Sequence, residues 1–272
     1  MSPSKSVKLS SRPAFARRIP DSTSPRACVS TYLLDPSTDT RSGSLCILKY
    51  DGIDGLKVEN EISTSAGVFR FDFRNPSTVV AALTDGSLVI QKIEEPISSD
   101  TIPVASDMLL DLGLSDSSIL ITTDNKGHAY LVDLNTSLIV SSWLAHSLPY
   151  VPGEGCEVWS CSVTPNAQTV VTGGEDGSMK LWDARSKTQI SQSKVFEAGV
   201  VFVDFQSEEQ ILTGSYDENV RIFDRRNLKD PLKVKKVSRF DLLNNFNITD
   251  MINSTWFLEI IHEWNSILRL QN

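Results

Sequence analysis

A two-residue turn recurs along the chain at a nearly constant spacing, and this repeat restricts the possible folds more than any other feature. The five turns each precede an alternating apolar run, and they are Ser42-Gly43, Asp85-Gly86, Lys126-Gly127, Asp176-Gly177 and Asp217-Glu218. Their second residues lie 43, 41, 50 and 41 positions apart. Asp-Gly and related dipeptides favour positive φ and close tight hairpins. We therefore expect repeated antiparallel units of about 42 residues.

Each unit has the same internal order. It opens with an alternating run, and the four clearest such runs are residues 68–73, 109–114, 158–163 and 200–205. A polar turn, a compact apolar run and the recurring turn follow. The next run ends in an apolar or aromatic residue and an aspartate, namely Asp133, Asp183 and Asp224. This is the position of the WD dipeptide in propeller blades, where we expect the aspartate to fix blade geometry by hydrogen bonding.

Period-2 alternation places one face of each strand against a neighbouring unit, so the units are expected to stack radially about an axis. The sequence predicts an all-β fold, a β-propeller of the WD-repeat type. A β-sandwich of irregular strands is the alternative, and the regular period argues against it. Only about five blades are recognisable, and closed rings contain four to eight.

The repeat also suggests domain boundaries. Residues 1–27 are rich in Ser, Lys and Arg and are interpreted as a disordered tail. Residues 28–236 carry the blades. Residues 237–272 form a divergent tail without Gly or Pro, in which residues 255–270 are expected to form an amphipathic helix. We interpret the chain as a truncated or alternatively spliced form of a longer propeller; the alternative is that the tail is a genuine helix that caps an open edge.

Composition excludes several classes of function. The net charge is −8 and the pI about 5.0, which argues against nucleic acid as the main partner. No run of 18 apolar residues is present, so no membrane span is expected. The spacing of the four cysteines fits neither a disulfide framework nor a zinc site, which indicates a cytoplasmic protein without metal or cofactor.

One repeat interval is longer than the others by about nine residues. The surplus falls in residues 146–156, a segment punctuated by Pro and Gly that precedes the alternating run 158–163. Insertions at this place in a repeat lie on one rim of a propeller, often the functional rim.

Particular residues around this insertion resemble one family. They lie in the segments 145–146, 157–161, 171–185 and 211–227, and the turn Thr213 to Glu218 is unusually specific. The chain resembles the diphthine methyl ester hydrolases, also called diphthine methyltransferases, which are WD-repeat proteins. The resemblance covers about residues 28–236 and is strongest from 145 to 227.

The resemblance implies seven blades and a specific reaction. The reaction is hydrolysis of the methyl ester of diphthine methyl ester on translation elongation factor 2, a step in diphthamide biosynthesis. The implied enzyme is a cytoplasmic monomer whose protein substrate is elongation factor 2. The alternative is a non-catalytic WD-repeat scaffold that binds protein partners, because propellers of many functions share this fold.

The residues themselves do not reveal a hydrolase, since there is no Gly-x-Ser-x-Gly elbow and no His-Glu-x-x-His helix. His146 is a candidate general base, and its alternative is a structural histidine within the blade. Glu157 is a second catalytic candidate that orients His146 or acts as a base; its alternative is a solvated carboxylate at the start of a strand.

Three further residues are candidates for substrate binding. Trp159 could form one wall of a cage for a trimethylammonium group through cation–π attraction, and its alternative is a core aromatic between blades. Asp176 and Asp217 are the other two, and their alternative is to shape the hairpin turns in which they lie.

Overall fold

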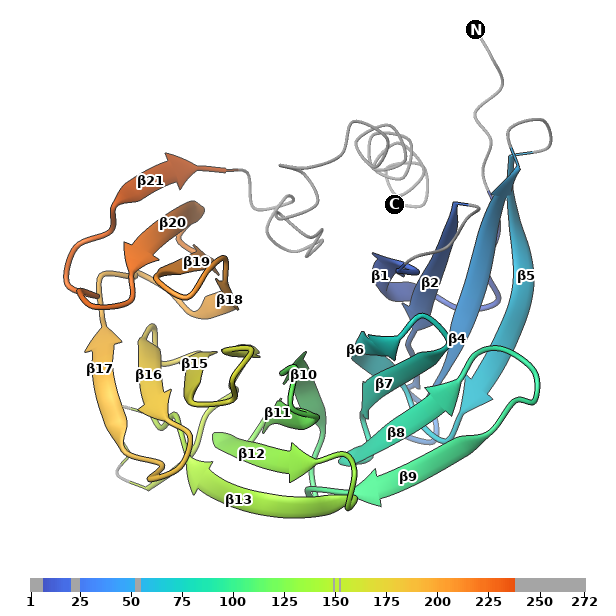
Figure 1. Cartoon of the computed structure of the whole chain (residues 1–272), viewed down its shortest axis with the longest axis horizontal. Coiled ribbons are helices and arrows are strands. Elements are labelled where there is room, and N and C mark those ends of the chain that lie inside the picture. The colour runs from blue at the N-terminus through green and yellow to red at the C-terminus, as the bar shows by residue number, and fades with distance from the viewer. Residues whose placement is uncertain (1–6, 21–24, 52–54, 149, 152, 238–272) are drawn as a thin grey trace, which may run out of the picture.

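Five antiparallel sheets follow one another around a common axis (Figure 1). The computed structural model describes residues 7–20, 25–51, 55–148, 150–151 and 153–237. Within these residues the secondary structure is all β, which confirms the predicted WD-repeat propeller and its five recognisable blades. The expected helix in residues 255–270 lies outside the described residues, as does nearly all of the tail 237–272.

Each blade contains four strands that run in order from the axis to the periphery, and the first blade has one additional strand. The first blade consists of β1 (Pro13–Arg18), β2 (Arg26–Thr31), β3 (Leu33–Asp35), β4 (Thr40–Asp51) and β5 (Gly55–Thr64). The second consists of β6 (Val68–Asn75), β7 (Thr78–Leu83), β8 (Ser87–Lys92) and β9 (Ser99–Pro103). The third consists of β10 (Leu109–Leu114), β11 (Ile119–Asp124), β12 (His128–Asp133) and β13 (Leu138–Leu144).

The last two described blades have the same layout. The fourth consists of β14 (Ser160–Val163), β15 (Thr169–Gly173), β16 (Met179–Asp183) and β17 (Gln189–Ser193). The fifth consists of β18 (Val200–Phe205), β19 (Gln210–Ser215), β20 (Asn219–Asp224) and β21 (Lys233–Lys236). Four clusters of buried apolar side chains each join two consecutive blades, so the alternating residues pack between blades as expected.

Four of the five recurring turns are confirmed. Gly86, Gly127 and Gly177 have φ of 85°, 93° and 67°, and Glu218 adopts the same left-handed conformation with φ 64°. The predicted turn at Ser42-Gly43 is wrong, because both residues lie inside β4. A Cβ at Gly43 would lie 2.5 Å from the carbonyl oxygen of Thr31, so this glycine permits a close backbone approach.

The N-terminal boundary also requires correction. Residues 13–18 were expected to belong to a disordered tail, but they form β1, which pairs with β2 from Pro13↔Thr31 to Arg18↔Ala27. The strand contains Phe15 and Ala16, which pack against neighbouring apolar residues. Because the segment contains Pro13 and several arginines, its sequence did not indicate the short innermost strand that it forms.

The innermost strands share an irregularity that positions the functional site. Residues that have no register partner, and thus form β-bulges, occur near the start of β1, β6, β10 and β18. The extra residues are Ala14, Phe69, Leu110 and Val201. A bulge re-aims a side chain out of the normal alternation. All four of these residues line a cavity at the axis.

The described part of the chain contains no helix that is long and apolar enough to cross a lipid bilayer. All four cysteines are buried and free.

Candidate functional site

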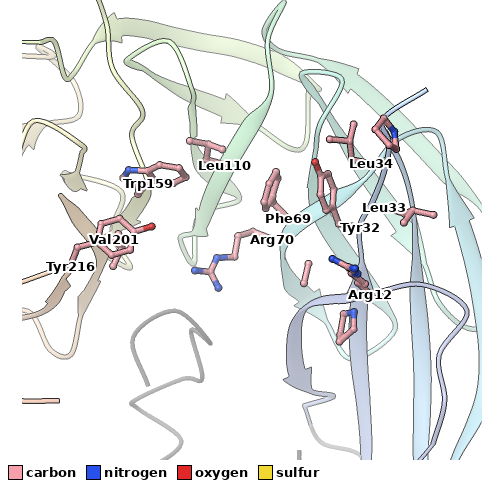
Figure 2. Close-up of a pocket in the computed structure, with 13 residues that line it drawn as sticks. Arg12, Tyr32, Leu33, Leu34, Phe69, Arg70, Leu110, Trp159, Val201 and Tyr216 are labelled. Carbon is pink, nitrogen blue, oxygen red and sulfur yellow. The ribbon is translucent and has the colours of Figure 1, made fainter. Parts of the chain in front are cut away.

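A cavity of about 810 Å³ lies where the innermost strands begin. Every described blade contributes to its wall, and Figure 2 shows the lining side chains. They are Arg12, Pro13, Ala14, Tyr32, Leu33, Leu34, Pro36, Phe69, Arg70, Leu110, Trp159, Val201 and Tyr216. The volume is in the range of small-ligand sites, and so is the combination of apolar walls with a few polar groups.

Aromatic rings face the cavity from two sides. Tyr32 and Phe69 are stacked, with ring centroids 5.0 Å apart and an interplanar angle of 26°. Gly67 leaves room for this stack, because a Cβ there would lie 2.5 Å from the ring of Tyr32. Figure 2 shows Trp159 and Tyr216 across the cavity from this pair. The site therefore presents aromatic faces to whatever occupies it.

Trp159 is held by a contact to the neighbouring turn. Its indole Nε1–H donates to Oε2 of Glu175 at 2.7 Å. Glu175 lies in the turn between β15 and β16, and its backbone N–H donates to the carbonyl oxygen of Glu157. A carboxylate thus lies beside one aromatic wall. Of the predicted substrate-binding residues, Trp159 is the one that the structure brings to the cavity.

Arg70 brings a positive charge to the cavity. Its Nε lies 3.3 Å from Oδ1 of Asp111, and its Cζ lies 4.5 Å from the centroid of the Phe15 ring. Asp111 also accepts hydrogen bonds from the backbone N–H groups of Leu112 and Cys161, each at 2.9 Å. Burial lowers the pKa of Arg70 and raises that of Asp111, and the charge of each partner opposes the shift.

A second belt of polar residues lies two positions further along the innermost strands. Arg17 Nη1 lies 2.6 Å from Oδ1 of Asp72, and the Ser162 hydroxyl donates to Oδ1 of Asp204 at 2.9 Å. Burial raises the pKa of Asp204 to about 6, and the nearby carboxylates of Asp111 and Asp72 add to that rise. Asp204 can therefore exchange a proton near neutral pH.

His146 lies within the fourth blade and is fully buried. Its Nδ1 is 2.8 Å from Oδ1 of Asp176, and its Nε2 is 2.8 Å from Oγ1 of Thr172. Trp182 Nε1–H donates to the same Thr172 oxygen at 2.9 Å. Both ring nitrogens are therefore engaged, and burial lowers the pKa of the imidazole. This geometry favours a structural histidine over a general base in contact with substrate.

The two candidate aspartates also lie within blade networks. Asp176 accepts from His146 and Ser178 and lies 3.2 Å from Lys180 Nζ. Burial opposes its ionisation, but these contacts outweigh burial and hold its pKa well below the usual range. Asp217 pairs with Arg221 Nη2 at 2.8 Å. Neither aspartate lines the cavity.

Glu157 is partly exposed and does not line the cavity. It precedes β14, and its backbone carbonyl accepts a hydrogen bond from the N–H of Glu175.

The three WD aspartates each end the third strand of a blade. Asp133, Asp183 and Asp224 accept from the backbone N–H of Asn135, Ser186 and Arg226, at 2.8, 2.7 and 2.9 Å.

Most of the residues that line the cavity were not predicted from the sequence. Tyr32, Phe69 and Arg70 were not singled out, and Tyr216 was noted only as part of the turn Thr213 to Glu218. A usable signal was present for four of the wall residues, because each is the second residue of an alternating run; they are Phe69, Leu110, Trp159 and Val201. A comparison of that place across repeats would have grouped them.

Comparisons with known proteins agree with this architecture. A family model described as "WD domain, G-beta repeat" matches residues 145–183. The chain is 31% identical to mouse "Diphthine methyltransferase" over 121 residues, which cover 42% of the chain and 24% of the relative. It is 25% identical to the Saccharomyces cerevisiae protein of that name, over 73% of the chain and 64% of the relative.

A third match is to the Caenorhabditis elegans "Mitotic checkpoint protein bub-3", at 35% identity over 26% of the chain and 21% of the relative. The chain thus spans less than two thirds of the length of each of these relatives. The recurring turns and the radial blades show that the chain is a WD-repeat propeller, and part of it is similar in sequence to diphthine methyltransferases from two organisms.

Proposed function

We propose that this protein hydrolyses the methyl ester of diphthine methyl ester on translation elongation factor 2, a step in diphthamide biosynthesis. The relatives named diphthine methyltransferase support this assignment. The structural observation that carries it is the axial cavity, whose aromatic walls surround a buried arginine. The substrate is a cytoplasmic translation factor, so the proposed activity belongs to that compartment.

The proposed substrate has two recognisable chemical groups on one modified histidine side chain, a trimethylammonium group and a methyl ester. Aromatic faces attract a quaternary ammonium ion, and this attraction strengthens when water is excluded. Tyr32, Phe69 and Trp159 supply such faces, and the carboxylate of Glu175 beside Trp159 adds attraction for a cation. The cavity thus suits the cationic half of the substrate.

The ester half requires attack on its carbonyl carbon. In the proposed reaction a water oxygen bonds to that carbon, and the bond from the carbon to the methoxy oxygen breaks. One water proton leaves with the methoxy group as methanol, and the other is released when the carboxylic acid ionises. None of the described lining residues is a serine, cysteine or histidine, which supports direct attack by water rather than an acyl-enzyme.

The test uses elongation factor 2 that carries the methyl ester intermediate, mixed with catalytic amounts of the full chain. Mass spectrometry follows the loss of one methylene equivalent and the release of methanol. We expect multiple turnovers. No mass loss in a reaction where the Saccharomyces cerevisiae relative is active would overturn the assignment for this chain.

A non-catalytic scaffold is the second candidate, and the outer strand β13 favours it. Leu138, Ile139 and Val140 on this edge strand are 64%, 42% and 59% exposed. Exposed apolar residues on an edge are characteristic of surfaces that pair with another protein. Absence of hydrolysis by both this chain and the relative, together with a defined complex that Val140→Lys abolishes, would establish this alternative.

A further inference from the structure

Arg70 is unusual among the cations of the cavity because its side chain is only 12% exposed and is fixed from two directions. Asp111 engages its Nε, and the ring of Phe15 covers one face of the guanidinium. In Figure 2 the guanidinium points away from Arg12, toward the side of the cavity that carries Trp159, Val201 and Tyr216. The charge is therefore presented to the cavity in one orientation.

Asp111 is the reason for this orientation. It accepts from Leu112 on its own strand and from Cys161 on the neighbouring blade, so its carboxylate cannot rotate without losing buried hydrogen bonds. The chain of contacts from Phe15 through Arg70 to Asp111 and Cys161 links the innermost strands of four blades. The trimethylammonium half of the substrate is positively charged, so an arginine repels it. Binding of that half therefore does not require Arg70.

A preorganised guanidinium in an enclosed site is suited to an oxygen that carries negative charge. We propose that Arg70 binds the carbonyl oxygen of the ester, stabilises the negative charge that develops there during water attack, and then holds the carboxylate of the product. Asp111 is its positioning residue. This inference rests on the proposed function and names the residue that acts on the reacting oxygen.

The assignment makes the site more complementary to the transition state and the product than to the substrate. The ester oxygen is neutral, whereas the tetrahedral oxygen and the carboxylate are anionic. Interactions that strengthen as charge develops raise kcat rather than lower KM. Removal of Arg70 should therefore lower kcat about a hundredfold or more, while KM for the methyl ester changes by less than about threefold.

A binding experiment separates the two halves of the ligand. The full chain is titrated with tetramethylammonium, with glycine betaine, which adds a carboxylate, and with the methyl ester of glycine betaine. We expect glycine betaine to bind about ten- to a hundredfold more tightly than the other two, the range for a charge-assisted hydrogen bond. In Arg70→Gln this preference should disappear while the affinity for tetramethylammonium persists.

Four variants are compared in this test. Arg70→Gln leaves Asp111 buried without its partner, so the double variant Arg70→Gln/Asp111→Asn removes both charges and protects folding. Arg70→Lys retains the charge without the planar guanidinium and should keep only part of the preference. Arg74→Gln removes an exposed arginine from the same strand and should behave as the unaltered chain.

The outcomes distinguish this inference from the proposed function. A folded double variant that still prefers glycine betaine would overturn the role of Arg70, whether or not the ester is hydrolysed. No binding of tetramethylammonium to the unaltered chain would instead overturn the aromatic cage. In that case acetate provides the remaining arm, because acetate binding that Arg70→Gln abolishes would still support an oxygen-binding arginine.

Discussion

Nε of Arg70 lies 3.3 Å from Oδ1 of Asp111, and this buried ion pair joins the innermost strands of two adjacent blades. Of the two partners, Arg70 also lines the cavity. One contact therefore contributes both to cohesion of the blades and to the charge of the site.

Loss of one partner should destabilise the fold strongly. Asp111→Ala leaves the guanidinium of Arg70 buried without a counter-charge and frees the N–H of Cys161. We expect a loss of about 3–5 kcal/mol in the free energy of unfolding, measured by urea denaturation. The double variant Arg70→Met/Asp111→Leu should recover much of this loss, and equal stability of the single variant and the unaltered chain would contradict the buried pair.

His146 should contribute to stability rather than to chemistry. His146→Ala removes one hydrogen bond each from Thr172 and Asp176 and leaves a cavity in the blade, and we expect a loss of about 2–4 kcal/mol in the free energy of unfolding. Activity per folded molecule should be retained. His128→Ala is the control, because its side chain is 41% exposed. A large fall in activity of folded His146→Ala would place the histidine in catalysis instead.

Asp204 should make stability depend on pH between about 4 and 6. Its folded pKa is raised from 3.8 to about 6, so folding favours the protonated carboxyl. Its contribution is fully present below pH 4 and is lost as the pH rises through 6. We expect Asp204→Asn to stabilise the chain by about 1–3 kcal/mol at pH 7.5 but hardly at all at pH 4.

The measurement is thermal unfolding of the two proteins at several pH values. Asparagine can still accept the hydrogen bond from Ser162, which keeps the comparison specific to charge. A stability difference that does not change between pH 4 and 7.5 would contradict the raised pKa.

Trp159 should carry part of the affinity for a quaternary ammonium ion. Cation–π attraction is worth about 0.5–2 kcal/mol, so Trp159→Ala should weaken tetramethylammonium binding about 2- to 30-fold, and Trp159→Phe less. Tyr150→Ala is a matched control, because this aromatic residue lies on the insertion and is 92% exposed. Calorimetric titration provides the readout, and equal loss from both alanine variants would argue against the cage.

The insertion contains two glycines, and substitution of one of them should destabilise the fold much more than substitution of the other. A Cβ at Gly155 would lie 1.7 Å from the carbonyl oxygen of Lys126, whereas nothing lies within 4 Å of a Cβ at Gly153. Gly155→Ala should therefore lower the melting temperature much more than Gly153→Ala, which carries only the strain of a positive φ, about 1–2 kcal/mol. Similar melting temperatures for the two variants would contradict this packing.

The repeated turns and alternating runs predicted the blades because both signals are local. Gly86, Gly127 and Gly177 adopt a positive φ that their dipeptides already indicate, and a run such as 200–205 shows its apolar pattern without reference to the rest of the chain. Gly43 was misassigned for the complementary reason. Its role depends on Thr31 and Gly67, which approach it only in the folded blade.

The sequence by itself determined the repeat, the all-β class and one wall residue of the cavity, Trp159. Only the tertiary structure decided that Tyr32, Phe69 and Arg70 share that cavity with it. Alternation determines which side chains leave a strand on the same face, but not which strands converge. The innermost strands converge at the axis because whole blades stack around it. β-Bulges then interrupt the alternation of side chains along these strands and turn residues such as Phe69 toward the centre.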